Sequence, residues 1–318
     1  MIIESKNLKY EWLDNWGGLN GDDAFSHGGM ALDSSGKIYC SFNSAPYIRV
    51  FTKEGEQIDS FEMSGEGMHC LTISKDSEGE WLWNINLDKQ EISKCTLDGK
   101  IIKTIDHAAF KLSAGERLQF TALSVDPNSG NVWVTDGYGI WLGEGTGGNK
   151  VYCFNSNLEL QFSFDGSEAE CGQFKEPHWI FADNRKGHTE IYIADRSNHR
   201  IVIYSAEGKY LRTIEEGLHT PSGFSSFGDK LVVTELKGRL HIIDKDDNIL
   251  ETLCDGSQYA DIKGWPQRIV EEKRVSPLFD IEQGKFNSPH GVLADDEGNI
   301  YVHEWLQGIR MTKLKAVS

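Results

Sequence analysis

Residues 180–214 read IFADNRKGHTEIYIADRSNHRIVIYSAEGKYLRTI, and this stretch decides the fold. It contains four short runs in which apolar and polar residues alternate, and the segments between the runs are rich in Gly, Asn, Asp and Ser. Alternation with a period of two is typical of strands that bury one face, and such turns join antiparallel neighbours. The stretch therefore predicts a four-stranded antiparallel sheet.

The same pattern recurs five more times along the chain. The other copies begin with GGMALDSSG at residue 28, HCLTISKDS at residue 69, TALSVDPNS at residue 121, SGFSSFGDK at residue 222 and HGVLADDEG at residue 290. Sheets repeated at a period of about 40 to 50 residues are typical of propellers. We predict an all-β fold, a six-bladed β-propeller that forms a single domain over residues 1–318.

The two ends of the chain are expected to share one blade. The last copy ends after IRMTKLK (309–315) with only three strands, whereas LKYEWLDNW (8–16) is an isolated strand near the N-terminus. Pairing the two would close the ring and remove exposed sheet edges. The insertions 140–150 and 254–286 are expected to be loops on the propeller faces.

Composition excludes several classes of partner. The chain has 32 Lys and Arg against 49 Asp and Glu, a net charge of −17, which disfavours nucleic acid and anionic membranes. No apolar run is long enough to span a membrane, and the first residues lack a secretory signal pattern. The six cysteines form no C-x-x-C pair and are expected to be buried free thiols, which favours a cytoplasmic location.

Histidine occupies one position in every second copy. Counting back five residues from the end of the first strand of each copy gives, in order, Gly28, His69, Thr121, His178, Ser222 and His290. Alternate blades are equally spaced around a six-bladed ring, and the first strand of a blade is innermost. Three imidazoles are therefore expected to converge at one mouth of the central channel.

Three neutral imidazoles with an open fourth position form a known catalytic site for zinc, which other divalent transition metals also accept. We predict His69, His178 and His290 as the metal ligands. The alternative is that each histidine only suits its turn and bonds a neighbouring carbonyl. His27 could supplement the group but is expected to face solvent, and His303 could face the channel. The remaining histidines are expected to be solvated: His107, His188, His199, His219 and His241.

A second position repeats in the turn that follows the second strand. It carries Asn43 in the first copy, Tyr138 in the third, Arg196 in the fourth and Trp305 in the sixth. Because neighbouring strands are antiparallel, this turn lies at the same face as the histidines. The Tyr138 phenol could transfer a proton, and the Arg196 guanidinium could bind a carboxylate. Alternatively, Tyr138 only caps a core and Arg196 only pairs with an acid of the next blade.

These residues resemble the peptidyl-α-hydroxyglycine α-amidating lyase branch of the NHL-repeat propellers. The run DRSNHRIVIY (195–204) is similar to an NHL signature, and the repeat resemblance covers nearly the whole chain. The resemblance implies that His69, His178 and His290 bind zinc, that Tyr138 in DGYG is the base, and that Arg196 in ADRS stabilises the substrate.

The chain departs from that family at several positions. Asn43 stands where the family has a second arginine, Ser288 stands where it has a methionine, and Gly291 replaces an acidic calcium ligand. The family's disulfide cysteines also have no counterparts beside Tyr138 or Arg196. Asn43, Ser288 and Trp305 are accordingly assigned to the binding of a substrate that differs from the family's peptides.

Three hypotheses for function follow. The first is a metal-dependent lyase that cleaves a carbinolamide or a related α-hydroxy compound, a small molecule that bears a carboxylate. The second is a metal-dependent hydrolase, similar to propeller lactonases, in which the metal activates water. The third is a non-catalytic NHL-type scaffold that binds a partner protein. The metal content of the purified protein separates the third hypothesis from the other two.

Overall fold

The computed structural model describes residues 1–22, 24–63, 65–112, 118–138, 148–270, 273–275 and 281–317. Most of the first predicted insertion (140–150) therefore lies outside the described residues, as do 271–272 and 276–280 of the second. No helix among the described residues is long and apolar enough to cross a membrane.

The chain is an all-β six-bladed β-propeller, as the repeats predict. Its residues form two compact units, and each unit contains three blades. Unit 1 comprises Met1–Glu66 and Ser222–Ser318, and unit 2 comprises Gly67–Pro221. The prediction that the whole chain is one folding domain stays a prediction.

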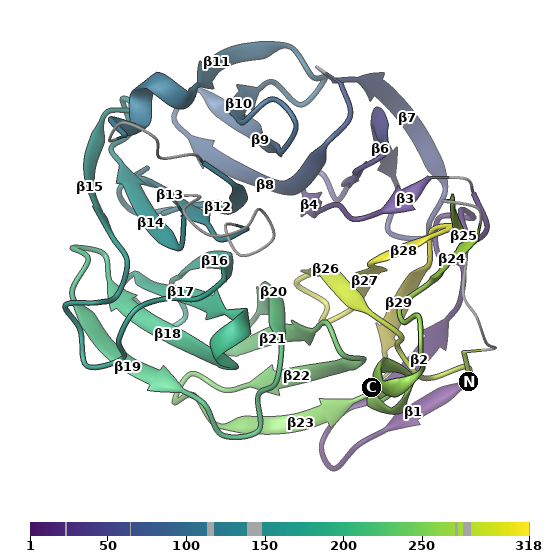
Figure 1. Ribbon diagram of the computed structural model, residues 1–318. Coiled ribbons are helices and arrows are strands. Elements are labelled where there is room, and N and C mark those ends of the chain that lie inside the picture. Colours follow the sequence, from purple (N-terminus) through teal and green to yellow (C-terminus); the bar gives the residue numbers. More distant parts are fainter. Residues whose placement is uncertain are drawn as a thin grey trace. The chain divides into compact units, whose positions relative to one another are not determined.

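Unit 2 holds the second, third and fourth blades, each a four-stranded antiparallel sheet (Figure 1). The second blade consists of β8 (Met68–Asp76), β9 (Gly79–Asn86), β10 (Glu91–Cys95) and β11 (Ile101–Ile105). The third consists of β12 (Phe120–Val125), β13 (Val132–Asp136), β14 (Lys150–Phe154) and β15 (Leu160–Phe164). The fourth consists of β16 (Pro177–Asp183), β17 (Glu190–Asp195), β18 (Arg200–Ser205) and β19 (Tyr210–Ile214). Two short 3-10 helices, η1 (His107–Phe110) and η2 (Arg196–Asn198), lie in connections.

Unit 1 holds the first, fifth and sixth blades. The first consists of β4 (Met30–Leu32), β5 (Ile38–Phe42), β6 (Ala45–Phe51) and β7 (Gln57–Glu62). The fifth consists of β20 (Pro221–Phe227), β21 (Lys230–Glu235), β22 (Arg239–Ile243) and β23 (Ile249–Leu253). The sixth consists of β26 (Pro289–Ala294), β27 (Ile300–Glu304), β29 (Met311–Ala316), β2 (Lys9–Leu13) and β1 (Ile2–Glu4). Smaller elements are β3 (Phe25–Ser26) with β28 (Leu306–Gln307), η3 (Ser257–Asp261), and β24 (Arg268–Val270) with β25 (Lys273–Val275).

The predicted closure of the sixth blade is confirmed. Strand β2 pairs with β29, with Trp12 opposite Leu314, and both ends of the chain lie at this blade (Figure 1). Trp12 is buried against Phe286, which anchors the N-terminal strand in the core. Strand β1 adds a fifth strand outside β2 that the repeat pattern did not predict.

The blades are held by apolar side chains that pack between neighbouring sheets. The inner strands are almost wholly buried, whereas the outermost strands alternate between exposed and partly buried residues or are mainly exposed. None of the six cysteines forms a disulfide, and all but Cys171 are buried, which confirms their prediction as free thiols in the core.

Candidate metal centre

Each predicted metal histidine lies at an irregularity between the first two strands of its blade. The strand register shifts between Met68 and Cys70, between Pro177 and Trp179, and between Pro289 and Gly291. The residue at the centre of each shift is His69, His178 or His290. A β-bulge leaves one residue without a partner opposite it and redirects its side chain. The bulge therefore explains how an imidazole leaves the regular inside–outside alternation of a buried strand.

Within unit 2, two of these histidines meet at a tyrosine. The ring centroids of His69 and His178 lie 5.3 Å apart, and the Tyr138 hydroxyl lies 2.9 Å from Nε2 of His69 and 3.0 Å from Nε2 of His178. A ring nitrogen of each histidine lies within 4.8 Å of one from the other. Both imidazoles are fully buried. The predicted proximity of His69, His178 and Tyr138 is present within unit 2.

Hydrogen bonding fixes the orientation of the His69 ring. Its Nδ1 lies 2.5 Å from the backbone carbonyl oxygen of Thr121, an atom that can only accept a hydrogen bond. Nδ1 must therefore carry the proton, and the lone pair of Nε2 points to Tyr138. Burial lowers the pKa of His69 to about 3, so the ring is neutral at neutral pH. A neutral imidazole with a directed Nε2 lone pair is the form that binds a metal ion.

Arg196 lies beside Tyr138, and Glu176 is its counter-ion. The guanidinium carbon is 5.9 Å from the Tyr138 ring centroid, and Nη2 lies 2.5 Å from Oε1 of Glu176. The other carboxylate oxygen of Glu176 accepts a hydrogen bond from Ser197. Arg196 and Glu176 are both buried. Arg196 thus pairs with an acid, but the acid comes from the same blade rather than the next, and Arg196 also contacts Tyr138. Its role at the site stays a prediction.

Opposing effects act on the Tyr138 phenol. Burial raises its pKa, while the positive charge of Arg196 and a hydrogen bond from it lower the pKa. The negative charge of Glu176 acts in the same direction as burial. The phenol is therefore protonated at neutral pH unless a further positive charge is close.

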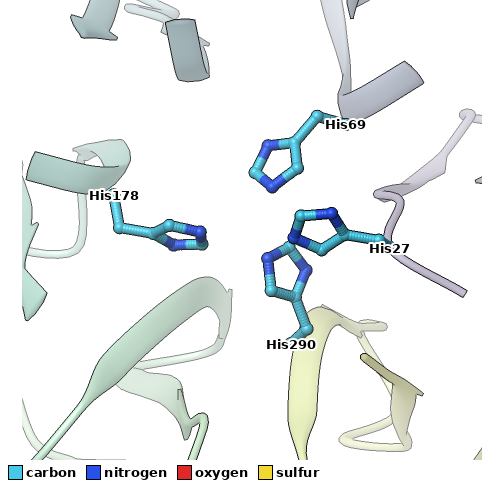
Figure 2. A group of neighbouring side chains, drawn as sticks. All are labelled: His27, His69, His178 and His290. Carbon is cyan, nitrogen blue, oxygen red and sulfur yellow. The ribbon is translucent and has the colours of Figure 1, made fainter. Parts of the chain in front are cut away.

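Unit 1 contributes a second pair of histidines. The rings of His27 and His290 lie 4.5 Å apart in an edge-to-face arrangement, and ring nitrogens of the two lie within 4.8 Å of each other. His27 also contacts Phe25 and Trp305. Figure 2 shows both pairs, His27 with His290 and His69 with His178. The expectation that His27 faces solvent is wrong, because its ring is half-buried against His290.

The residues predicted to bind substrate take different places in unit 1. Trp305 is half-buried with its ring 5.9 Å from that of His27. Ser288 is fully buried and its hydroxyl donates to the Trp305 carbonyl, so this side chain holds the turn. Asn43 is half-buried at the end of β5. A role in substrate binding stays a prediction for all three.

The acidic residue that ends the second strand has a structural role that the sequence did not suggest. Asp136 accepts a hydrogen bond from the Gln119 backbone, Asp195 from Lys175 and Glu176, and Glu304 from Asn287 and Ser288. In each case the bonded backbone lies just before the first strand of the same blade. These buried carboxylates hold the loops that lead into His178 and His290 in the fourth and sixth blades.

Two other histidines are buried, and of these only His241 departs from expectation. His303 is buried against Phe42, with 5.2 Å between ring centroids, and neither ring nitrogen has a hydrogen-bond partner among the described residues. Burial lowers its pKa to about 3. His241, expected to be solvated, is buried beside Thr252 and Glu235. The other four are exposed as predicted: His107, His188, His199 and His219.

Comparison with known proteins supports the fold. No family model matches the chain. A streptogramin B lyase structure is similar at a TM-score of 0.60 and 14% identity, covering 97% of this chain and 98% of that one. The virginiamycin B lyase of Staphylococcus aureus is similar at 0.61 and 16%, covering 97% and 100%. A gluconolactonase from Xanthomonas campestris is similar at 0.61 and 14%, covering 97% and 90%. At these identities the likeness is one of fold, and the resemblance to amidating lyases stays a prediction.

Proposed function

We propose that this chain is a metal-dependent lyase in which His69, His178 and His290 bind one divalent transition-metal ion, with His27 as a further ligand. The observation that carries the proposal is the arrangement within unit 2. There, Nε2 atoms of two buried imidazoles face one phenolic oxygen, and the Nδ1 proton of His69 is held by a backbone carbonyl. His27, which is half-buried, and His290, which is buried, supply a second pair of imidazoles.

The donor set fits zinc or a similar ion. Four imidazole nitrogens suit Zn²⁺, whereas Ca²⁺ and Mg²⁺ require oxygen ligands. When bound, such an ion lowers the pKa of a coordinated hydroxyl group and stabilises developing negative charge. The lyase neighbours also support a histidine-based reaction, because a histidine-to-alanine variant of the virginiamycin B lyase is described as catalytically inactive.

Tyr138 is the proposed base, and Arg196 tunes it. A protonated phenol cannot accept a proton, so Tyr138 must first be ionised; a divalent ion held by the histidines would favour this, in addition to the positive charge of Arg196. The phenolate then takes the proton of the substrate hydroxyl while a carbonyl forms and the bond from the same carbon to nitrogen or oxygen breaks. The departing nitrogen or oxygen then takes this proton back from the Tyr138 phenol, which regenerates the phenolate and balances the elimination.

The buried Glu176 bears on the class of substrate. Its carboxylate already neutralises Arg196, and a substrate carboxylate at the same guanidinium would lie close to a second negative charge. We therefore propose a small molecule that is uncharged at its reacting end, in place of the carboxylate expected from Arg196 alone. The net charge of −17 disfavours anionic substrates further.

The proposal is tested by metal content and turnover together. Protein purified without added metal is analysed for bound elements, and zinc affinity is measured by chelator competition for wild type, His178→Ala and His199→Ala. His199 is the matched control because it is an exposed histidine of the same blade. We expect His178→Ala to lose both metal and turnover and His199→Ala to keep both. Turnover by a metal-free His178→Ala protein would contradict the proposal.

Labelled water separates elimination from hydrolysis. A panel of carbinolamides and lactones is incubated with the enzyme in water enriched in oxygen-18. Hydrolysis of a lactone places one solvent oxygen in the acid product, whereas elimination forms no such acid. If labelled acid forms at a rate that depends on the bound metal, the protein is a hydrolase and the lyase proposal is wrong.

A further inference from the structure

Thr121 occupies in the third blade the position that His69 and His178 occupy in the second and fourth. It lies in a register shift between Phe120 and Leu123, equivalent to the shifts that carry the histidines. Thr121 is fully buried, and it makes hydrogen bonds to both neighbouring blades. By sequence it is simply a small residue between two histidines.

The backbone of Thr121 orients His69. Its carbonyl oxygen accepts the Nδ1 proton of His69 at 2.5 Å, which places the lone pair of Nε2 opposite the Tyr138 hydroxyl. A rotation of this peptide group would release the ring and allow the other tautomer. The direction of the His69 lone pair therefore depends on where Thr121 is held.

The side chain of Thr121 is bonded to the other histidine's strand. Its hydroxyl lies 2.7 Å from the carbonyl oxygen of Pro177, the residue immediately before His178. The same hydroxyl lies 2.8 Å from that of Thr135 on β13, which in turn bonds the backbone of Ala122. One residue thus connects the His69 imidazole to the peptide group that carries His178.

We propose that Thr121 is a positioning residue that fixes the separation and direction of the Nε2 atoms of His69 and His178. The inference rests on the proposed metal site for its consequence, but its geometry is independent of a bound ion. Residues that orient metal ligands from behind alter metal affinity by about 10- to 100-fold when they are changed. A threonine with only a packing role would affect stability and leave affinity unchanged.

The test compares three variants with wild type. Thr121→Val removes the hydroxyl at nearly constant shape, and Thr121→Ser retains it. Thr189→Val is the matched control, because Thr189 is a buried threonine of unit 2 whose hydroxyl bonds Asp126, away from the histidines. Zinc affinity is measured by chelator competition, and urea midpoints report stability.

We expect Thr121→Val to weaken zinc binding about 10- to 100-fold, with Thr121→Ser and Thr189→Val within about threefold of wild type. Equal affinity of Thr121→Val and wild type would overturn the inference, as would an equal loss in Thr189→Val. If Thr121→Val does not fold, Thr121→Ala makes the same comparison with Thr121→Ser.

A measurement on metal-free protein keeps this inference separate from the proposed function. The Nδ1 proton of His69 is observed by NMR, and its exchange with water is expected to be at least about tenfold faster in Thr121→Val than in Thr189→Val. If wild type binds no zinc, the metal proposal fails while this exchange rate still decides the role of Thr121. Equal exchange rates in the two variants would remove that role.

Discussion

Replacement of Glu176 by Gln tests whether Arg196 is committed to a partner within the protein. Both side chains are buried and their charged atoms lie 2.5 Å apart, so the variant leaves a guanidinium without its counter-ion. Removing one member of a buried ion pair costs about 3–5 kcal/mol. Gln can still accept one hydrogen bond, which favours the lower end, about 3 kcal/mol.

The assay is urea unfolding of Glu176→Gln, Arg196→Met and the double variant. The double variant is expected to be more stable than Glu176→Gln alone, because it leaves no unpaired buried charge. Asp22→Asn is the control: Asp22 and Arg49 form an ion pair at 3.0 Å, and their side chains are 33% and 21% exposed. Water screens that pair, so its loss should cost only about 1 kcal/mol. A cost for Glu176→Gln no larger than for Asp22→Asn would refute the reasoning and leave Arg196 available for a substrate carboxylate.

Three further predictions concern the phenol, a buried histidine and the closing strand. Tyr138→Phe should keep zinc within about tenfold of wild-type affinity but reduce turnover about 10²- to 10⁴-fold, since it removes the proposed base; turnover above a tenth of wild type would contradict that role. The pKa of His303 is about 3 in the folded protein and about 6.5 in the unfolded chain, so protonation favours the unfolded chain. The free energy of unfolding of wild type should therefore fall by about 1.4 kcal/mol per pH unit as the pH falls from 6.5 towards 3. His303→Phe lacks this loss, and its stability relative to wild type should increase by about 2 kcal/mol between pH 7.5 and pH 5 in urea titrations; no change with pH would show that His303 is solvated. Trp12→Ala should cost about 3–5 kcal/mol in the same assay, because Trp12 fills the contact between β2 and the core; a cost below about 1 kcal/mol would mean that β2 does not anchor the sixth blade.

The fold could be predicted because its signals are local. Each blade is one continuous stretch, so alternation and turn residues specify its strands without knowledge of distant contacts. Even the closing strand was visible, because residues 8–16 form an isolated strand and residues 309–315 end a blade one strand short. Strand β1 was not visible, because it only extends the edge of a sheet that the pattern already completed.

The site could be predicted only where it follows the repeat. His69, His178 and His290 share one register position, and Tyr138 and Arg196 both lie in the turn after the second strand, two residues and one residue after its last acidic residue. His27 lies one residue before the first-blade position, and nothing local indicates that its ring packs against His290. Glu176 was missed for a similar reason, since pairing with Arg196 depends on how β16 and η2 approach each other. Contacts between elements decide both cases, and a single sequence does not record them.

The small residues between the histidine blades are required by packing as well as chemistry. A Cβ atom at Gly137 would overlap the carbonyl oxygen of Pro177, and one at Gly223 would overlap the carbonyl oxygen of His290. The backbone at each of these histidines therefore approaches the preceding blade too closely for a larger neighbour.

Hydroxyl groups use the space that remains. Thr121 donates to the carbonyl of Pro177 in unit 2, and Thr234 donates to the carbonyl of His290 in unit 1 at 2.8 Å. In the third and the fifth blade, a threonine hydroxyl thus bonds the backbone at the histidine of the next blade along the chain. We expect a histidine in place of Thr121 to remove one of these bonds, so the small residue at this position supports the proposed ligands on either side of it.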